Sequence, residues 1–125
     1  MSAPTTKKSK EAAGEVETVN EVRLVGRVSQ APEERVLPSG DSLWTFRVVV
    51  PRPAVRGGSR QTVDALECAV WGGRVRRSVA SWAEGDLVEV TGSVRRRFFR
   101  AGAAAASRVE IEVSGGRLMR RAGSG

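Results

Sequence analysis

An alternation of apolar and polar side chains at every second residue is the feature that most restricts how this chain can fold. The alternation extends from Asn20 to Leu118, and a period of two residues is typical of β-strands. The strands that it predicts are residues 21–29, 43–50, 63–71, 86–99 and 108–113.

One segment departs from this period, immediately after the two glycines at 72 and 73. Val75, Val79 and Trp82 follow at spacings of four and three residues, which place them on one face of a helix. Gly85 is a residue type at which helices commonly end. The spacing therefore predicts one short amphipathic helix between the third and fourth strands.

The predicted strands are joined by segments rich in proline, glycine and small residues. Residues 31–41, which include Pro32, are expected to form a turn region. Residues 51–61 contain three arginines and no acidic residue, and they predict a flexible basic loop. Residues 100–107 predict a loop of small side chains, and Gly26 inside the first strand predicts a bulge or a sharp bend.

Three strands, one helix and two strands in about 100 residues is the element order of the oligonucleotide/oligosaccharide-binding (OB) fold. The sequence therefore predicts an all-β chain with a five-stranded OB barrel over residues 20–118. Residues 1–19 are polar and lack the apolar run of a signal peptide or membrane anchor, so we expect a disordered leader. Residues 119–125 are expected to be a short flexible tail.

The basic excess of the chain belongs to its patterned part. The net charge is +7, and 18 of the 21 basic residues are arginine. Residues 20–118 hold 16 arginines and 11 acidic residues, a difference of +5, which could form a binding face for a polyanion. The alternative is a GC-rich genome that inflates arginine and scatters it. Seven of the 16 arginines cluster in the basic loop or beside Phe99, which favours a patch that contacts phosphates.

Several kinds of chemistry are excluded or disfavoured by composition. The chain has no histidine and one cysteine, so a His/Cys zinc site, an internal disulfide and the usual base of a catalytic triad are excluded. The acidic residues, including Asp86 and the pair Glu110 and Glu112, are interpreted as solvated surface groups. We expect no catalysis, no metal and no cofactor, and a reducing cytoplasm is the simplest location.

Two aromatic residues lie on strand faces that are otherwise polar or small. Trp71 shares its strand face with Glu67 and Ala69, and Phe99 shares its face with Arg95 and Arg97. Rings beside arginines on a solvent face are typical of proteins that bind single-stranded nucleic acid, because the ring stacks on a base and the guanidinium contacts phosphate. The alternative is that strand twist turns each ring into the core or a subunit contact.

The other aromatic residues and the cysteine are interpreted as packing groups. Phe46 and Trp82 are expected in the core, and Trp44 is expected to be buried or at a subunit contact. Phe98 has the parity of Val94 and is expected to pack. Because the alternation places the cysteine at 68 on the core side, we expect a buried, unreactive thiol.

The chain resembles the bacterial single-stranded DNA-binding protein (SSB) family over residues 20–118. The matching pieces are NEVRLVGRVS, APEERVLPSG, AVWGG and EGDLVEVTGSVRRRFF. The resemblance implies an OB fold, sequence-independent binding of single-stranded DNA, and assembly as a homotetramer or occasionally a dimer. It also implies that Trp71 and Phe99 are stacking aromatics.

The chain departs from the family at two stacking positions and at its C-terminus. Ala54 and Ala65 stand where well-studied members have tryptophan, and the chain ends in RRAGSG instead of an acidic tail that recruits partners. Because one stacked base contributes about 1–3 kcal/mol, two missing rings would weaken binding by roughly 2–6 kcal/mol unless arginines compensate.

The first hypothesis is a non-catalytic, nucleoid-associated protein that binds single-stranded DNA in replication, recombination or repair. Trp71 and Phe99 would stack on bases. The phosphates would be contacted by Arg52, Arg56, Arg60, Arg95, Arg97 and Arg100. The alternative is an accessory OB-fold subunit of the replication-restart or mobile-element type, kept mainly for protein contacts, which the missing aromatics and tail favour.

Overall fold

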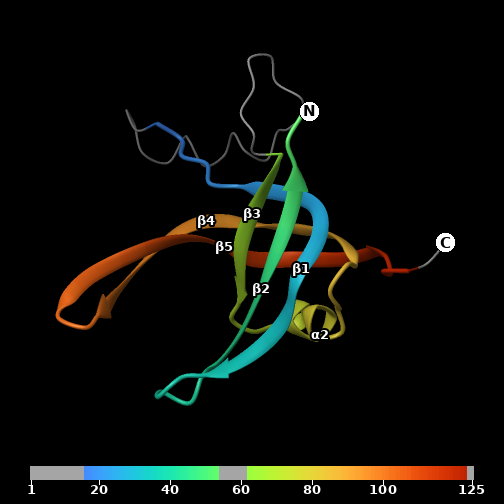
Figure 1. Ribbon diagram of the computed structural model, residues 1–125. Coiled ribbons are helices and arrows are strands. Elements are labelled where there is room, and N and C mark those ends of the chain that lie inside the picture. Colours follow the sequence, from blue (N-terminus) through green and yellow to red (C-terminus); the bar gives the residue numbers. More distant parts are fainter. Residues whose placement is uncertain (1–15, 54–61, 124–125) are drawn as a thin grey trace.

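The computed structural model describes residues 16–53 and 62–123. The elements are β1 (Val22–Val36), β2 (Ser42–Pro51), β3 (Val63–Val70), α2 (Arg74–Ala80), β4 (Leu87–Ala101) and β5 (Ala104–Arg120). The strands close into a barrel in the order β1-β2-β3-β5-β4, with α2 at one end (Figure 1). This architecture confirms the predicted five-stranded OB barrel with one short helix. No helix in the described part of the chain is long and apolar enough to cross a membrane.

Strand β1 pairs with two neighbours in succession, and this closes the barrel. Its first residues pair with β4 up to Arg27, and from Arg27 onward it pairs with β2. Gly26 lies at the crossover, where an added Cβ would collide with the carbonyl oxygen of Val49. Gly26 thus permits a close approach of two backbones, and the irregularities in the β1–β2 pairing lie further on, between Val28 and Glu33.

The core fills the barrel with side chains from all five strands and from the helical segment. Phe46 and Trp82 meet edge to face, with ring centroids 5.4 Å apart, and both are buried, as is Cys68. Trp82 follows α2, which ends at Ala80. The predicted core positions of these three residues are confirmed, and Trp44 packs partly buried against the same cluster.

The predicted turn over residues 31–41 is wrong for its first half, because β1 continues to Val36 and pairs there with Ser42. Proline cannot donate to a strand ladder and is tolerated at bulges. Pro32 lies within the register shift between Gln30 and Glu33, so it interrupts the ladder without ending the strand. Only residues 37–41 form the turn, closed by a hydrogen bond from Leu37 N to Asp41 O of 2.8 Å.

The β4–β5 hairpin is longer than the alternation predicted. The expected loop at 100–107 is mostly strand, with a tight turn at Gly102, whose φ is +66°, and β5 runs two residues into the expected tail. The hairpin projects from the barrel (Figure 1), because β3 pairs with β5 only at Cys68–Ile111 and Ala69–Glu112.

This projection overturns the expectation that Phe98 and Val94 pack inward. Phe98 is 77% exposed, and Val94 and Val109 are also exposed. Their face of the strand continues the core face, but beyond the barrel nothing within residues 16–53 and 62–123 buries it.

Candidate nucleic-acid interface

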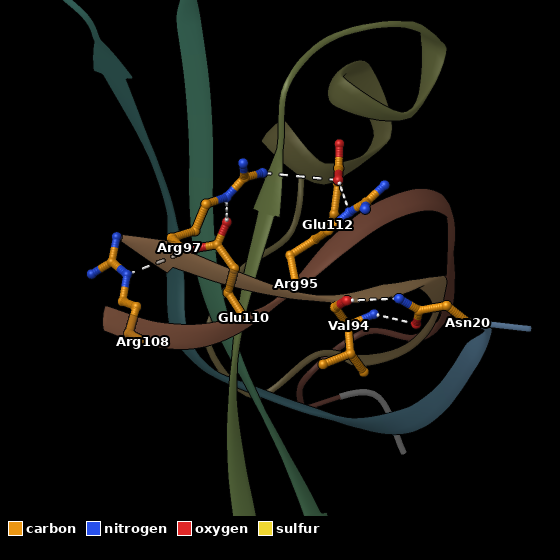
Figure 2. A network of polar contacts seen from close by, with 7 residues as sticks. All are labelled: Asn20, Val94, Arg95, Arg97, Arg108, Glu110 and Glu112. Atoms are coloured by element: carbon orange, nitrogen blue, oxygen red, sulfur yellow. Dashed lines mark hydrogen bonds and ion pairs between the residues drawn. The ribbon is translucent and has the colours of Figure 1, made fainter. Parts of the chain in front are cut away.

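One face of the β4–β5 hairpin carries alternating arginines and glutamates that pair across the strands. The register places Arg97 opposite Arg108 and Arg95 opposite Glu110, so residues of opposite charge are diagonal neighbours, within reach of long side chains. Arg97 Nε donates to Glu110 Oε2 at 2.9 Å, and Arg95 Nε donates to Glu112 Oε1 at 2.7 Å (Figure 2). This face is therefore charged but largely balanced internally.

Trp71 lies immediately after β3, where the third strand meets this hairpin. The residue is 39% exposed, and the guanidinium carbon of Arg97 lies 5.3 Å from the centroid of its ring. A guanidinium at this distance over a ring face is held by the ring's quadrupole. Arg97 thus joins an accessible indole to the carboxylates of β5.

Phe99 repeats this arrangement nearer the hairpin tip. The residue is 45% exposed, and the guanidinium carbon of Arg108 lies 5.8 Å from its ring centroid. Arg108 also pairs with Glu110 at 3.7 Å. The two rings are therefore connected without a break through Arg108, Glu110 and Arg97. The platform, as we call this surface, consists of Trp71, Arg95, Arg97, Phe99, Arg108, Glu110 and Glu112.

The two glutamates of the platform differ in their exposure. The side chain of Glu110 is 7% exposed between Arg97 and Arg108, whereas that of Glu112 is 34% exposed and also reaches Arg97 Nη2 at 3.8 Å. The expectation of a solvated surface is therefore wrong for Glu110, because two arginines of the hairpin cover it. The alternation placed the acidic and basic residues on their faces, but their pairing depends on the hairpin register.

Asn20 is a further residue that positions the platform. Its Nδ2 donates to Val94 O at 2.8 Å, and its Oδ1 accepts from Val94 N at 2.9 Å (Figure 2). The amide therefore continues the ladder where β4 leaves the barrel, one residue before Arg95. The resemblance includes Asn20, but the alternation alone does not indicate this role.

Arg52 is not brought together with the platform. It binds Asp64 Oδ1 through Nε at 3.0 Å and Nη2 at 2.8 Å. Asp64 lies six residues before Val70, at the other end of β3, so about 20 Å of strand separates this pair from Trp71. The hydrogen bond from Arg52 lowers the pKa of Asp64. The predicted contacts Arg56 and Arg60, and also Ala54, lie outside the described residues.

Arg100 belongs by its register to the opposite face of the hairpin. Alternate residues share a face, so Arg100 lies with Arg96 and Phe98. Arg96 donates to Ser107 Oγ at 3.1 Å. We call this side, with Val94, Arg96, Phe98, Ser107 and Val109, the back face.

Two further acidic residues, Asp86 and Glu89, form ion pairs with arginines outside the platform. Asp86 is buried, which corrects its interpretation as a solvated group. Burial would raise its pKa, but the N–H groups of Ala122 and Ala83 and the guanidinium of Arg121 outweigh this and lower it. Glu89 pairs with Arg117 and Arg23, whose hydrogen bonds lower its pKa. Within residues 16–53 and 62–123, no cluster of three His, Cys, Asp or Glu residues could hold a metal ion.

Two proteins named as single-stranded DNA-binding proteins are similar in sequence to part of this chain. Single-stranded DNA-binding protein 3 of Listeria innocua is 35% identical over 79 residues, covering 63% of this chain and 49% of that protein. Single-stranded DNA-binding protein 1 of Streptococcus agalactiae serotype III is 32% identical over 80 residues, covering 63% and 48%. The chain thus spans about half the length of these relatives.

A solved structure shares the fold. The chain in "Plasmodium falciparum SSB complex with ssDNA" superposes with a TM-score of 0.69 at 23% identity, covering 85% of this chain and 97% of that chain. The family model described as the single-strand binding protein family matches residues 19–118. This match confirms the resemblance over the whole barrel, and the chain belongs to the single-strand binding protein family.

Proposed function

We propose that this protein binds single-stranded DNA without sequence preference and without catalysis, in replication, recombination or repair. The observation that carries the proposal is the platform: two accessible aromatic rings, Trp71 and Phe99, joined by a continuous series of charged contacts. Such rings accept any base, because every base has a π-face. Membership of the family and the names of the relatives support the same ligand.

Stacking contributes the part of binding that is insensitive to salt. Phe99 lies two residues from Arg97 along β4, which is about 7 Å of strand, so the two ring sites can take bases of one strand. Each stacked base is expected to contribute about 1–3 kcal/mol. Trp71 and Phe99 are therefore the residues on which affinity depends most.

The arginines of the platform contribute to DNA binding by exchanging a glutamate partner for a phosphate. In the free protein Arg95 and Arg97 are bound to carboxylates, so a phosphate must replace a glutamate before it gains a full contact. Arg52 and Arg100 are proposed as peripheral contacts, since Arg52 pairs with Asp64 at the far end of β3 and the register of Arg100 places it on the opposite face of the hairpin. Arg56 and Arg60 keep the phosphate role that the sequence predicts.

The test compares two adjacent phenylalanines on opposite faces of one strand. In binding of a fluorescent mixed-sequence oligonucleotide, Phe99→Ala should weaken the affinity about fivefold or more, the lower end of the stacking range. Phe98→Ala removes a ring of the same size from the back face and should leave affinity unchanged for an oligonucleotide too short to contact two protein chains. Equal effects of both variants would remove Phe99 from the site, and no binding by the unaltered protein would favour an accessory protein-interaction subunit.

We also propose that the protein forms a homo-oligomer, a tetramer before a dimer, in the nucleoid-containing cytoplasm. The exposed apolar side chains of the back face, Phe98, Val94 and Val109, support self-association, because contiguous exposed apolar surface marks interaction sites. Light scattering of the full chain with and without poly(dT) measures the assembly. A monomer at all concentrations would contradict this proposal and leave the DNA-binding proposal standing.

A further inference from the structure

Helix α2 presents three arginines to solvent and buries the opposite side. Arg74, Arg76 and Arg77 are exposed, whereas Val79 is fully buried and Val75 packs against the core. The first turn of the helix contains no acidic residue. Among the residues that the structure describes, none of these three arginines forms an ion pair with a carboxylate, in contrast to Arg97 and the other arginines of the platform.

This charge begins next to the stacking site. Only Gly72 and Gly73 separate Trp71 from Arg74, and three residues span at most about 11 Å. Among the described residues, a Cβ added at either glycine would meet nothing within 4 Å, so none of these residues fills the space beside the two glycines. In Figure 2 the turn after β3 passes beside the Arg97–Glu112 contact on its way to the helix.

We propose that α2 extends the track of single-stranded DNA beyond Trp71, with Arg74, Arg76 and Arg77 contacting consecutive phosphates. The inference rests on the proposed function and adds a second, electrostatic part to the same site. The platform offers rings but few uncommitted cations, whereas α2 offers uncommitted cations and no ring. A strand stacked on Trp71 and continuing over the helix gains both.

The sugar–phosphate backbone is the occupant that this arrangement fits best. Arg77 lies about 4.5 Å further along the helix axis than Arg74, so one flexible polyanion can contact both. Contacts of this kind release counterions and make the affinity depend on salt, with a log–log slope of about 0.7 per phosphate on a single strand.

The experiment compares two double variants that lose the same charge. Arg74→Gln with Arg77→Gln removes two arginines of the track and keeps residues of similar helix propensity. Arg23→Gln with Arg117→Gln removes two arginines that flank Glu89 in the β1–β4–β5 part of the barrel. Binding of poly(dT) is measured for both full-length variants from about 50 to 200 mM salt, and thermal melting checks that both are folded.

If α2 contacts phosphates, the slope of log affinity against log salt concentration should be shallower by about 1.4 in the α2 variant, because it loses two contacts that contribute about 0.7 each. Between about 50 and 200 mM salt its affinity should therefore fall about sevenfold less than that of the unaltered protein. The Arg23 and Arg117 variant should keep nearly the original slope. Equal slopes for the two variants would overturn the track.

The outcomes separate this inference from the proposed function. If Trp71→Ala weakens binding but the α2 variant behaves like its control, the track is wrong and the stacking site stands. If the unaltered protein does not bind poly(dT), the proposed function fails as well, whereas binding that neither change affects would remove both Trp71 and α2 from the site. A selective loss of binding to polyglutamate, with poly(dT) binding unchanged, would assign α2 to an acidic protein partner and overturn the track.

Discussion

Replacing Glu112 by glutamine tests whether the carboxylates of the platform compete with DNA for its arginines. Glu112 Oε1 accepts from Arg95 Nε at 2.7 Å and lies 3.8 Å from Arg97 Nη2. Its side chain is one third exposed, so the variant should fold. Glu110 contacts Arg97 at 2.9 Å and Arg108 at 3.7 Å, but it is nearly buried, which makes Glu112→Gln the cleaner change.

The size of the effect follows from the contacts that the variant releases. A partly exposed ion pair contributes about 0.2–1 kcal/mol, and DNA no longer has to break the pair with Arg95. Affinity at low salt should therefore rise about 1.4-fold to fivefold. Arg95 then offers one complete phosphate contact, which should steepen the salt slope by about 0.7.

The assay is fluorescence anisotropy of a labelled oligonucleotide at several salt concentrations. Glu89→Gln is the matched control, because it removes one negative charge and releases two arginines, Arg23 and Arg117, away from the platform. Weaker binding by Glu112→Gln, or an increase equal to that of the control, would refute competition. Weaker binding would show instead that the carboxylates hold the arginines in the geometry that DNA needs.

Three further predictions concern the barrel. Gly26→Ala should lower the free energy of unfolding in urea by about 1–3 kcal/mol or more, because its Cβ meets the backbone of Val49; an unchanged midpoint would contradict the close approach. Since the pKa of Asp86 is lowered in the fold, its stabilisation is complete above the ordinary value of about 3.9 and is lost as pH falls through the lowered value. Asp86→Asn should therefore reduce the free energy of unfolding at neutral pH by about 1–3 kcal/mol. Its melting temperature should also fall less than that of the native protein as the pH is lowered into the acidic range; an equal fall would contradict this. Burial, followed by the charges of Glu67 and Glu110, raises the pKa of Cys68 to about 12, so the native thiol should not react with iodoacetamide at neutral pH, and rapid labelling before unfolding would contradict its burial.

The alternation predicted the barrel because side chains that face a closed core must be apolar at every second position. It failed where local residues and global context conflict. Pro32 indicated a turn, but a register shift in the β1–β2 pairing accommodates it. Phe98 has core parity, yet parity states only which residues share a face and not whether another sheet covers that face.

The sequence predicted the positions of the two aromatic rings in the candidate site better than the pairing of its charged side chains. The faces of Trp71 and Phe99 follow from single strands, and both rings are accessible as expected. The pairing of Arg97 with Glu110 depends on the hairpin register, which a turn of two residues sets, and the sequence had suggested a longer loop. The distance of Arg52 from Trp71 depends on the antiparallel course of β2 and β3, which composition does not contain.

The central claim, that DNA bases stack on Trp71, is tested most directly by tryptophan fluorescence during titration with poly(dT). The native protein should be quenched to saturation, because stacking changes the environment of an exposed indole, whereas Trp82 is buried. Trp71→Phe keeps a ring for stacking, so it should still bind poly(dT) in an anisotropy assay while losing most of the quenching. Saturable binding with no quenching in the native protein, or equal quenching in Trp71→Phe, would contradict the account.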